Sequence, residues 1–440
     1  MLSVALAIAL AGNVILALQV KSESDREDRL RAQAATLQDT IDTLRRQQDT
    51  RSIFERITSA VEQIRELRFL RTVSPRIITD EQLAAVVEQR FRAGNPRTQV
   101  EQDDAVLTAW GLLGPHDDLY DILLGVVREQ VAGFYDVQSK RLVVGGNGAN
   151  PSPLDQVLLA HEYVHAVTDQ HFDLTRLEKL SAAHKDDEAT AYLSLIEGDA
   201  TVMMFRYAAR YLTPSERTEV ARDAAAAPSA RIGSAPKAIR ESLLFPYEAG
   251  RQFVQSLIDS GGISALNRAY QDPPTSTEQI LHVSKYLSRP RDEPTPVQVP
   301  ALAHTMGSGW SDIKGGGFGE LDMRLLVDQF LPQGDADAAA AGWDGGRYAA
   351  AESAAGTVVA TMTVWDSEGE ARQAEETLAR WLPARYGNTG NDVHLDGVAG
   401  RGWESPTGAG AVVRNGTRVL LVVAPDRASV DRARSAFPGF

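Results

Sequence analysis

Two histidines and a glutamate in one short segment have the types and spacing of a metal-dependent hydrolytic site. His161, Glu162 and His165 lie within LLAHEYVHAV, residues 158–167. On a helix, residues i and i+4 project from the same face, so both imidazoles can bind one metal ion. Glu162 then points toward a water on that ion, from which it can take a proton. The segment therefore predicts metal-assisted hydrolysis.

The surrounding residues predict a buried helix that begins just before this segment. The non-ligand positions from 163 to 167 are uncharged, so the helix can be buried with the metal as its polar feature. Ser152, Pro153 and Asp155 provide an N-cap, a proline at the first helical position and an acidic partner for a capping box. We expect the helix to start there.

A third metal ligand is expected from a second apolar helix, which we predict from Asp186 to Leu212. Glu197 lies in its segment LIEGDA, and Gly198 would let this helix approach the metal helix closely. Asp199 and Glu188 are lesser candidates for the same role.

These motifs resemble those of the HExxH zinc metallopeptidases. Glu197 with the following Gly and Ala is similar to the ligand helix of the gluzincins, the thermolysin-like branch of the MA clan. The resemblance implies a zincin-like fold and Zn²⁺ held by His161, His165 and Glu197, with Glu162 as general base. It implies hydrolysis of a peptide bond, as in an endopeptidase.

A second branch, the metzincins, offers a different third ligand. His171 follows His165 by six residues, which is the metzincin spacing, and Met203 or Met204 would then supply the methionine turn. Metzincins turn sharply at a glycine three residues past the second histidine, but Thr168 stands there, and a β-branched residue disfavours positive φ. We therefore favour Glu197.

The residue that orients a metal-binding histidine is a separate question. Many gluzincins use an Asp for this role at the position where this chain has Thr201, so Asp169 and Asp199 are the candidates to replace it.

The resemblance also implies a hydrogen-bond donor for the oxyanion and a strand that holds the substrate. For the donor we rank His282 first and Tyr247 second, with Tyr286 as a third candidate. Apolar runs on either side of a polar turn predict a β-hairpin over residues 131–144. Leu142, Val143 and Val144 are expected to form a sheet edge that binds an extended substrate, the alternative being an ordinary structural hairpin.

The N-terminal region predicts attachment to a membrane. Residues 2–20 are uncharged and long enough to span a bilayer, and the absence of a basic region before them favours an anchor over a cleaved signal, with a buried helix as the remaining alternative. Residues 21–68 have the pattern of a helical stalk. The basic residues after the segment favour a cytoplasmic location, whereas resemblance to anchored envelope peptidases favours an extracytoplasmic catalytic part, which we prefer.

Composition excludes several classes of function. The 440 residues carry a formal net charge of −14, which argues against nucleic acid as a partner. There is no cysteine, so disulfides, thiol catalysis and cysteine-ligated zinc are excluded.

The chain is expected to be an α+β protein with a mainly helical metallopeptidase domain at 69–290 and a smaller α+β domain at 291–440. Residues 222–236 read as a mobile linker. Strands at 356–365 and 409–423, the latter with a hairpin at Asn415-Gly416, and helices at 367–382 and 427–436 form the second domain, with Trp343, Trp365 and Trp403 in its core. Residues 66–290 also resemble a set of membrane-anchored bacterial proteins with HExxH, EGDA and STEQILH helices.

Other classes of function remain alternatives to a peptidase. One is a non-catalytic, envelope-anchored binding or scaffold protein that keeps a zincin fold. Another is hydrolysis of a non-peptide amide in the cell wall. The peptidase reading implies a peptide or protein substrate.

Overall fold

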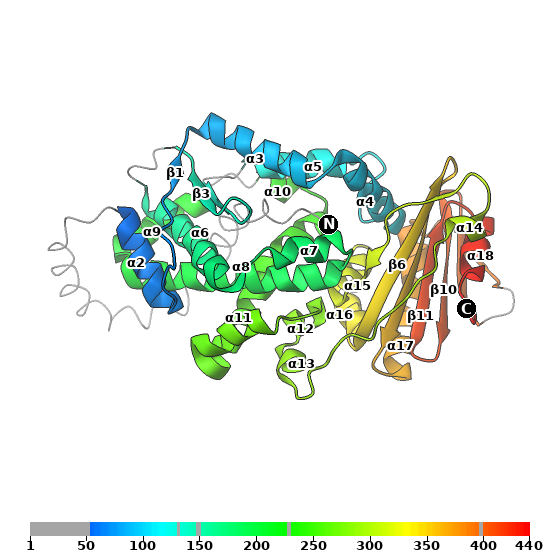
Figure 1. Ribbon diagram of the computed structural model, residues 1–440. Helices are drawn as coiled ribbons and strands as arrows, with labels where there is room; N and C mark the ends of the chain where they lie inside the picture. Colours follow the sequence, from blue (N-terminus) through cyan, green and yellow to red (C-terminus); the bar gives the residue numbers. More distant parts are fainter. Residues whose placement is uncertain (1–52, 130–132, 147–150, 227–229, 396–398) are drawn as a thin grey trace.

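The computed structural model describes residues 53–129, 133–146, 151–226, 230–395 and 399–440. They form an α+β protein in which a mainly helical part with a three-stranded sheet packs against an eight-stranded sheet (Figure 1). The expected membrane segment at 2–20 and the stalk residues 21–52 lie outside the described residues. Among the described helices, none combines the length and apolar content that a bilayer crossing requires.

The helical part contains the elements that carry the predicted site. Its elements are α2 (Ile53–Arg65), β1 (Arg76–Ile77), α3 (Asp80–Gly94), α4 (Arg97–Trp110), α5 (Leu119–Glu129), β2 (Gly133–Asp136), β3 (Arg141–Val144), α6 (Pro153–Phe172), α7 (Arg176–Ala182), α8 (Asp186–Tyr211), α9 (Pro214–Ala226), α10 (Ala230–Ser234), α11 (Lys237–Gln271), α12 (Thr277–Leu281) and α13 (Val283–Leu287).

The C-terminal part is built around the large sheet. Its elements are α14 (Ala303–Met306), β4 (Ser311–Asp312), β5 (Gly316–Gly317), α15 (Glu320–Asp328), α16 (Gln333–Ala340), β6 (Trp343–Ser353), β7 (Gly356–Trp365), α17 (Glu368–Arg385), β8 (Asn391–Val393), β9 (Gly400–Ser405), β10 (Gly408–Asn415), β11 (Arg418–Ala424) and α18 (Arg427–Ser435).

Helix α6 starts where its sequence predicts. The Ser152 side chain accepts from the backbone N–H of Asp155, and the Asp155 carboxylate accepts from the Ser152 N–H at 2.9 Å. This reciprocal pair satisfies two donors that a helix N-terminus otherwise leaves unpaired. Both histidines of the motif are buried on this helix, as expected.

Glycines bring α8 into backbone contact with α11, and not with α6 as we expected. A Cβ on Gly198 would lie 2.2 Å from the carbonyl oxygen of Gly250, and one on Gly250 would lie 2.1 Å from that of Ser194. The missing side chains let the two backbones touch. The close backbone contact at Gly198 therefore holds α11, which carries Tyr247, against α8, which carries Glu197.

Gly198→Ala is expected to destabilise the protein by about 3 kcal/mol, because the new methyl group meets backbone atoms that cannot move aside. Thermal unfolding of the metal-free protein measures this as a fall in Tm. Gly233→Ala is the matched control, since its Cβ would meet nothing within 4 Å. Equal Tm values for the two variants would contradict the proposed backbone contact.

Helix α2 belongs to the core and not to a separate stalk. Ile57, Val61 and Ile64 are almost fully buried in the cluster that also contains α6 and α8. Arg65, with no exposed surface, donates from Nε to Asp199 of α8 at 2.9 Å. The core of the helical part therefore already includes apolar residues from Ile57 onward, ahead of the expected domain start at residue 69.

The small sheet corrects our prediction of the edge strand. Its order is β1-β3-β2, so β3 is central, with β2 antiparallel on one side and β1 parallel on the other. Val143 and Val144 pair with Arg76 and Ile77, and Leu142 is fully buried. The hairpin itself is confirmed, but residues 142–144 form no free edge, because a short strand from far upstream covers them.

The large sheet confirms most of the expected C-terminal elements. Its order is β4-β6-β7-β11-β10-β9-β8, with β5 also paired to β6. Strand β7 matches the predicted range, and β10 and β11 are joined through a turn at Gly416, whose φ is +61°. Trp343, Trp365 and Trp403 are buried, as predicted. Strands β6, β8 and β9 were not predicted.

Alternation along β11 places its side chains on two buried faces. Leu421 and Val423 share a cluster with α17, whereas Leu420 and Val422 share another with α18. The first face also joins the helical part, since Trp110 of α4 packs against aromatic rings of the C-terminal part and donates from Nε1 to Thr361 Oγ1 at 3.3 Å. One hydrophobic cluster thus extends across the expected boundary at 291.

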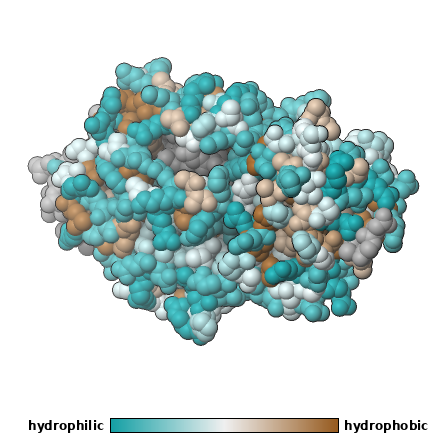
Figure 2. Space-filling view, turned by 45° about the vertical axis from the view of Figure 1, so that its right-hand side comes forward, coloured by the Kyte–Doolittle hydropathy of each residue, from teal (hydrophilic) through white to brown (hydrophobic). Residues whose placement is uncertain are grey.

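The expected linker is also corrected. Most of residues 222–236 are helical, in α9 and α10, with 227–229 outside the described residues. Further along the chain, Ser276 caps α12 by accepting from the Gln279 N–H. The face in Figure 2 is mostly hydrophilic, with apolar residues in small patches, as expected when the apolar faces of the elements pack inside.

Candidate metal centre

Helices α6 and α8 bring the three predicted ligands together. His161 Nε2 lies 2.9 Å from His165 Nε2, and Glu197 Oε2 lies 3.3 Å from the first and 3.5 Å from the second. All three side chains are buried, with exposed fractions of 2%, 2% and 0%. The group can hold a metal ion.

The two His–Glu distances fit a tetrahedral ion, and the His–His distance of 2.9 Å is shorter. Ligands about 2.0–2.2 Å from a tetrahedral centre stand about 3.3–3.6 Å apart, close to the two His–Glu distances. Among the described residues, no hydrogen-bond partner satisfies either carboxylate oxygen of Glu197. An unsatisfied buried carboxylate is costly unless a cation compensates it. The donor set therefore fits a divalent metal that takes nitrogen and oxygen ligands.

The other candidate ligands lie elsewhere. His171 is exposed, and its Nε2 is 2.8 Å from the Arg68 carbonyl, so the metzincin-type site is wrong for this fold. Glu188 pairs with Arg176 and Lys185, and Asp199 with Arg65. Helix α6 continues straight past Thr168 to Phe172, which carries His171 away from the ligand face.

A second carboxylate group, Asp292, Asp344 and Asp366, also has metal-like spacing, but two of its members pair with a lysine. Lys285 Nζ lies 3.2 Å from Asp292 and 2.8 Å from Asp366. This group is an ion-pair cluster.

Glu162 faces the same site from α6. It is 4% exposed, and one of its oxygens accepts the backbone N–H of Tyr135 at 2.7 Å. Burial raises the pKa of Glu162 to about 7, and the charge of Glu197 adds to the rise, while His161 and the Tyr135 N–H oppose it. A carboxyl group with a pKa near 7 is suited to accept and return a proton.

Tyr247, and not His282, lies at the site. The Tyr247 ring is 1% exposed and stacks on His161, with centroids 6.3 Å apart. Burial raises the pKa of Tyr247 well above its usual value, and Glu197 and Glu162 raise it further, so its hydroxyl stays protonated.

The two other expected oxyanion donors are engaged elsewhere. His282 Nε2 pairs with Glu320 at 3.0 Å on a side chain that is 42% exposed, and the Tyr286 hydroxyl donates to the Asp272 carbonyl at 2.8 Å. Our first choice, His282, is therefore wrong, because α12 ends at that residue and turns it toward α15.

Neither acid expected to orient the histidines does so. Asp169 accepts the Tyr135 hydroxyl and Lys140 Nζ, each at 2.8 Å. Asp199 accepts Arg65 and the Tyr270 hydroxyl. Within the part of the chain that the structure describes, His161 Nδ1 has no hydrogen-bond partner. Both acids instead tie neighbouring elements to α6 and α8.

A cleft of about 1050 Å³ reaches the ligand group at His165. His165, Leu193 and Ile196 lie in its wall, together with Asp136 from the end of β2 and Lys314 from the C-terminal part. A chain-like substrate therefore has space beside the ligands.

Comparison with known proteins adds one match. Residues 311–434 match a family model described as a domain of unknown function, DUF8575. No curated protein matches the chain, and no solved structure matches it. The matched range covers the large sheet with α15 to α18 and leaves out the ligand helices.

Sequence reasoning missed two residues that shape the site, Tyr135 and Arg65. Tyr135 acts through its backbone N–H, which has no signal in the sequence. Arg65 directly follows the apolar series Ile57, Val61 and Ile64. Because an arginine beside a buried apolar face needs a compensating charge, this position could have suggested a buried acidic partner.

Proposed function

We propose that this protein is a zinc-dependent peptidase of the gluzincin type with a zincin-like fold. The observation that carries the proposal is the convergence of His161, His165 and Glu197, with the two His–Glu distances at tetrahedral spacing and Glu162 beside them. Zn²⁺ favours two imidazoles and one carboxylate, and catalytic zinc sites keep a fourth position open. We further propose that residues 2–20 anchor the chain in a membrane with the catalytic part extracytoplasmic.

Glu162 is the proposed general base. A bound zinc ion would supply Lewis acidity that lowers the pKa of a coordinated water and polarises a carbonyl. Glu162 then takes the proton of the attacking water and later returns it to the leaving amine. The Tyr135 N–H holds one oxygen of Glu162, which fixes the carboxylate while the other oxygen exchanges the proton.

Tyr247 is the proposed donor to the oxyanion. Its hydroxyl stays protonated, and its ring is fixed against His161 by stacking and by the close approach of α11 to α8. A donor in a buried site stabilises developing negative charge strongly, because solvent does not screen it.

Tyr247→Phe is expected to lower kcat about 100-fold, because it removes one oxyanion donor and keeps the ring. Zinc content and KM should stay near wild type. Tyr286→Phe is the matched control, since it loses a hydroxyl that bonds the Asp272 carbonyl. Steady-state kinetics on one peptide decides the matter, and an unchanged kcat for Tyr247→Phe would remove Tyr247 from the mechanism.

Strand β2 is the proposed guide for the substrate backbone, in place of residues 142–144. It is the outer strand of the small sheet on the α6 side, and its Tyr135 N–H points away from β3 to Glu162. Asp136 at its end lines the cleft. A peptide in the cleft can therefore run beside β2 and past the proposed base.

The proposal is tested on the metal-depleted full chain. We expect it to bind about one zinc ion and to cleave internal bonds in a mixed peptide library, read by mass spectrometry, with a chelator stopping cleavage. Zinc binding without cleavage of any peptide would overturn the peptidase and leave a zinc-binding scaffold as the function.

A further inference from the structure

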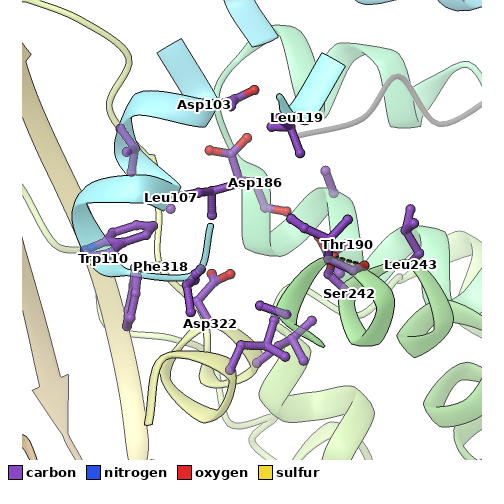
Figure 3. A pocket seen from close by; sticks show the side chains of 18 of the residues that line it. Asp103, Leu107, Trp110, Leu119, Asp186, Thr190, Ser242, Leu243, Phe318 and Asp322 are labelled. Carbon is purple, nitrogen blue, oxygen red and sulfur yellow. Dashed lines mark hydrogen bonds between the residues drawn. The ribbon is translucent and has the colours of Figure 1, made fainter. Parts of the chain in front are cut away.

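A mostly apolar cavity of about 190 Å³ lies between the helical part and the C-terminal part. Its wall combines residues far apart in the chain, as Figure 3 shows: Leu107, Trp110 and Leu119 from α4 and α5, Leu243 from α11, and Phe318. Apolar lining of this kind binds an apolar group that would otherwise stay in water.

Three carboxylates, Asp103, Asp186 and Asp322, line the same cavity (Figure 3). Asp103 is paired with Lys314 at 2.6 Å, and Asp322 accepts the Gly319 N–H at 2.7 Å. Asp186 differs from them. It is 5% exposed and lines the cavity, and its charge acts on Lys314 together with that of Asp103, but no hydrogen bond and no ion pair within 4 Å to its carboxylate is found in the described ranges.

Among the described residues, acids outnumber bases next to the apolar walls of the cavity. Within this part of the chain, Lys314 supplies one positive charge for the three acids. Burial raises the pKa of Asp322 to about 7, and the charge of Asp186 contributes to the rise, although the Gly319 N–H opposes it. A buried, unpaired carboxylate is stabilised when a cation reaches it.

The cavity adjoins the cleft at the metal ligands. Leu193 and Asp186 line both spaces. On α8, Leu193 stands one turn before Glu197, and Asp186 stands eleven residues before it, which is about 16 Å along the helix. A substrate chain lying in the cleft can therefore send a side chain past Leu193 toward Asp186.

We propose that this cavity is a specificity subsite for a long basic side chain of the substrate, of the lysine type. The methylene stem lies against Leu107, Leu119 and Leu243, and the ammonium group pairs with Asp186. The C-terminal part, through Phe318 and Asp322, then contributes directly to substrate choice. Only the role of the cavity in catalysis rests on the proposed function. Binding of a ligand in the cavity is measured separately.

Binding is tested with n-hexylammonium as a probe on the zinc-loaded full chain by isothermal titration calorimetry. Wild type should bind it at least tenfold more tightly than hexan-1-ol, which has the same stem without the charge. Asp186→Asn should weaken hexylammonium binding at least tenfold. The control Asp121→Asn, an exposed acid on α5, should not change it. Equal binding of the two probes, or full binding by Asp186→Asn, would overturn the proposal.

A second variant tests the cavity independently of its charge. Leu243→Trp fills the apolar space and leaves every acid in place, so it should also abolish hexylammonium binding. Retained binding in this variant, with helical content unchanged by circular dichroism, would show that the probe sits elsewhere and would overturn the proposal.

Catalysis gives the third measurement. A cleaved peptide is prepared with each residue replaced in turn by lysine or norleucine. At one position lysine should give a kcat/KM at least tenfold above norleucine, and Asp186→Asn should remove this preference, whereas the control Asp121→Asn should keep it. Cleavage without any such position would overturn the subsite, whereas probe binding without any cleavage would overturn the peptidase instead.

Discussion

Glu162→Gln is expected to lower kcat by at least about 1,000-fold and to leave zinc binding intact. Glutamine keeps the size of the side chain and can still accept the Tyr135 N–H, but it cannot take a proton from water. General acid–base catalysis contributes about 10²–10⁴-fold. The three ligands are unchanged, so zinc content should remain about one per chain.

Kinetics and metal analysis on the same preparation test this prediction. Glu248→Gln is the matched control, because this acid follows Tyr247 on α11 and its side chain is exposed. The control should keep wild-type activity. A Glu162→Gln protein that binds zinc and cleaves peptides at a normal rate would show that another group is the base.

The unfolding of metal-free protein gives Glu162 a readout that does not depend on activity. Its pKa is about 7 in the folded chain against an ordinary 4.5, so the folded state binds more protons between these values. The free energy of unfolding should therefore fall by about 3 kcal/mol as pH rises from 4.5 to 7. Glu162→Gln should lack this contribution, so urea unfolding at pH 5 and pH 8 should give it the smaller pH dependence. If the free energy of unfolding changed equally between pH 5 and pH 8 in wild type and in Glu162→Gln, a group other than Glu162 would be the one that titrates.

Glu197→Gln is expected to weaken zinc binding by more than about 100-fold. Loss of an outer partner of a ligand costs about 10–100-fold, and removing a direct charged ligand should cost more. Glu197 is fully buried, and its oxygens have no hydrogen bond in the described structure. The neutral amide of the variant cannot balance the charge of the zinc ion, and its oxygen is a weaker ligand than a carboxylate oxygen.

Zinc-dependent stabilisation measures this loss. At free zinc about 1,000 times the dissociation constant, wild type should gain about 4 kcal/mol, seen as a rise in Tm that Glu197→Gln lacks. Glu188→Gln, on the same helix but paired with Arg176 and Lys185, should keep the full rise. His171→Ala should also keep it. If zinc did not raise the Tm of His171→Ala, His171 would be a zinc ligand, as in a metzincin-type site.

The sequence by itself determined the ligand helices, because their signals are local. The i, i+4 spacing of His161 and His165 sets their common face, and the Ser152 cap sets where α6 begins. The apolar pattern around Glu197 was enough to place it on a buried helix, since 3.6-residue periodicity depends only on neighbouring residues. The strand predicted at 356–365 likewise matches β7.

Only the tertiary structure decided which distant groups meet these helices. It placed Tyr247 on His161 and turned His282 to Glu320, made β3 a central strand, and buried α2 through Arg65 and Asp199. Each of these contacts joins elements that are separated by intervening chain in the sequence. Their partners depend on packing, such as the contact of Gly198 with Gly250, and packing is set by the whole core and not by the pattern of any one segment.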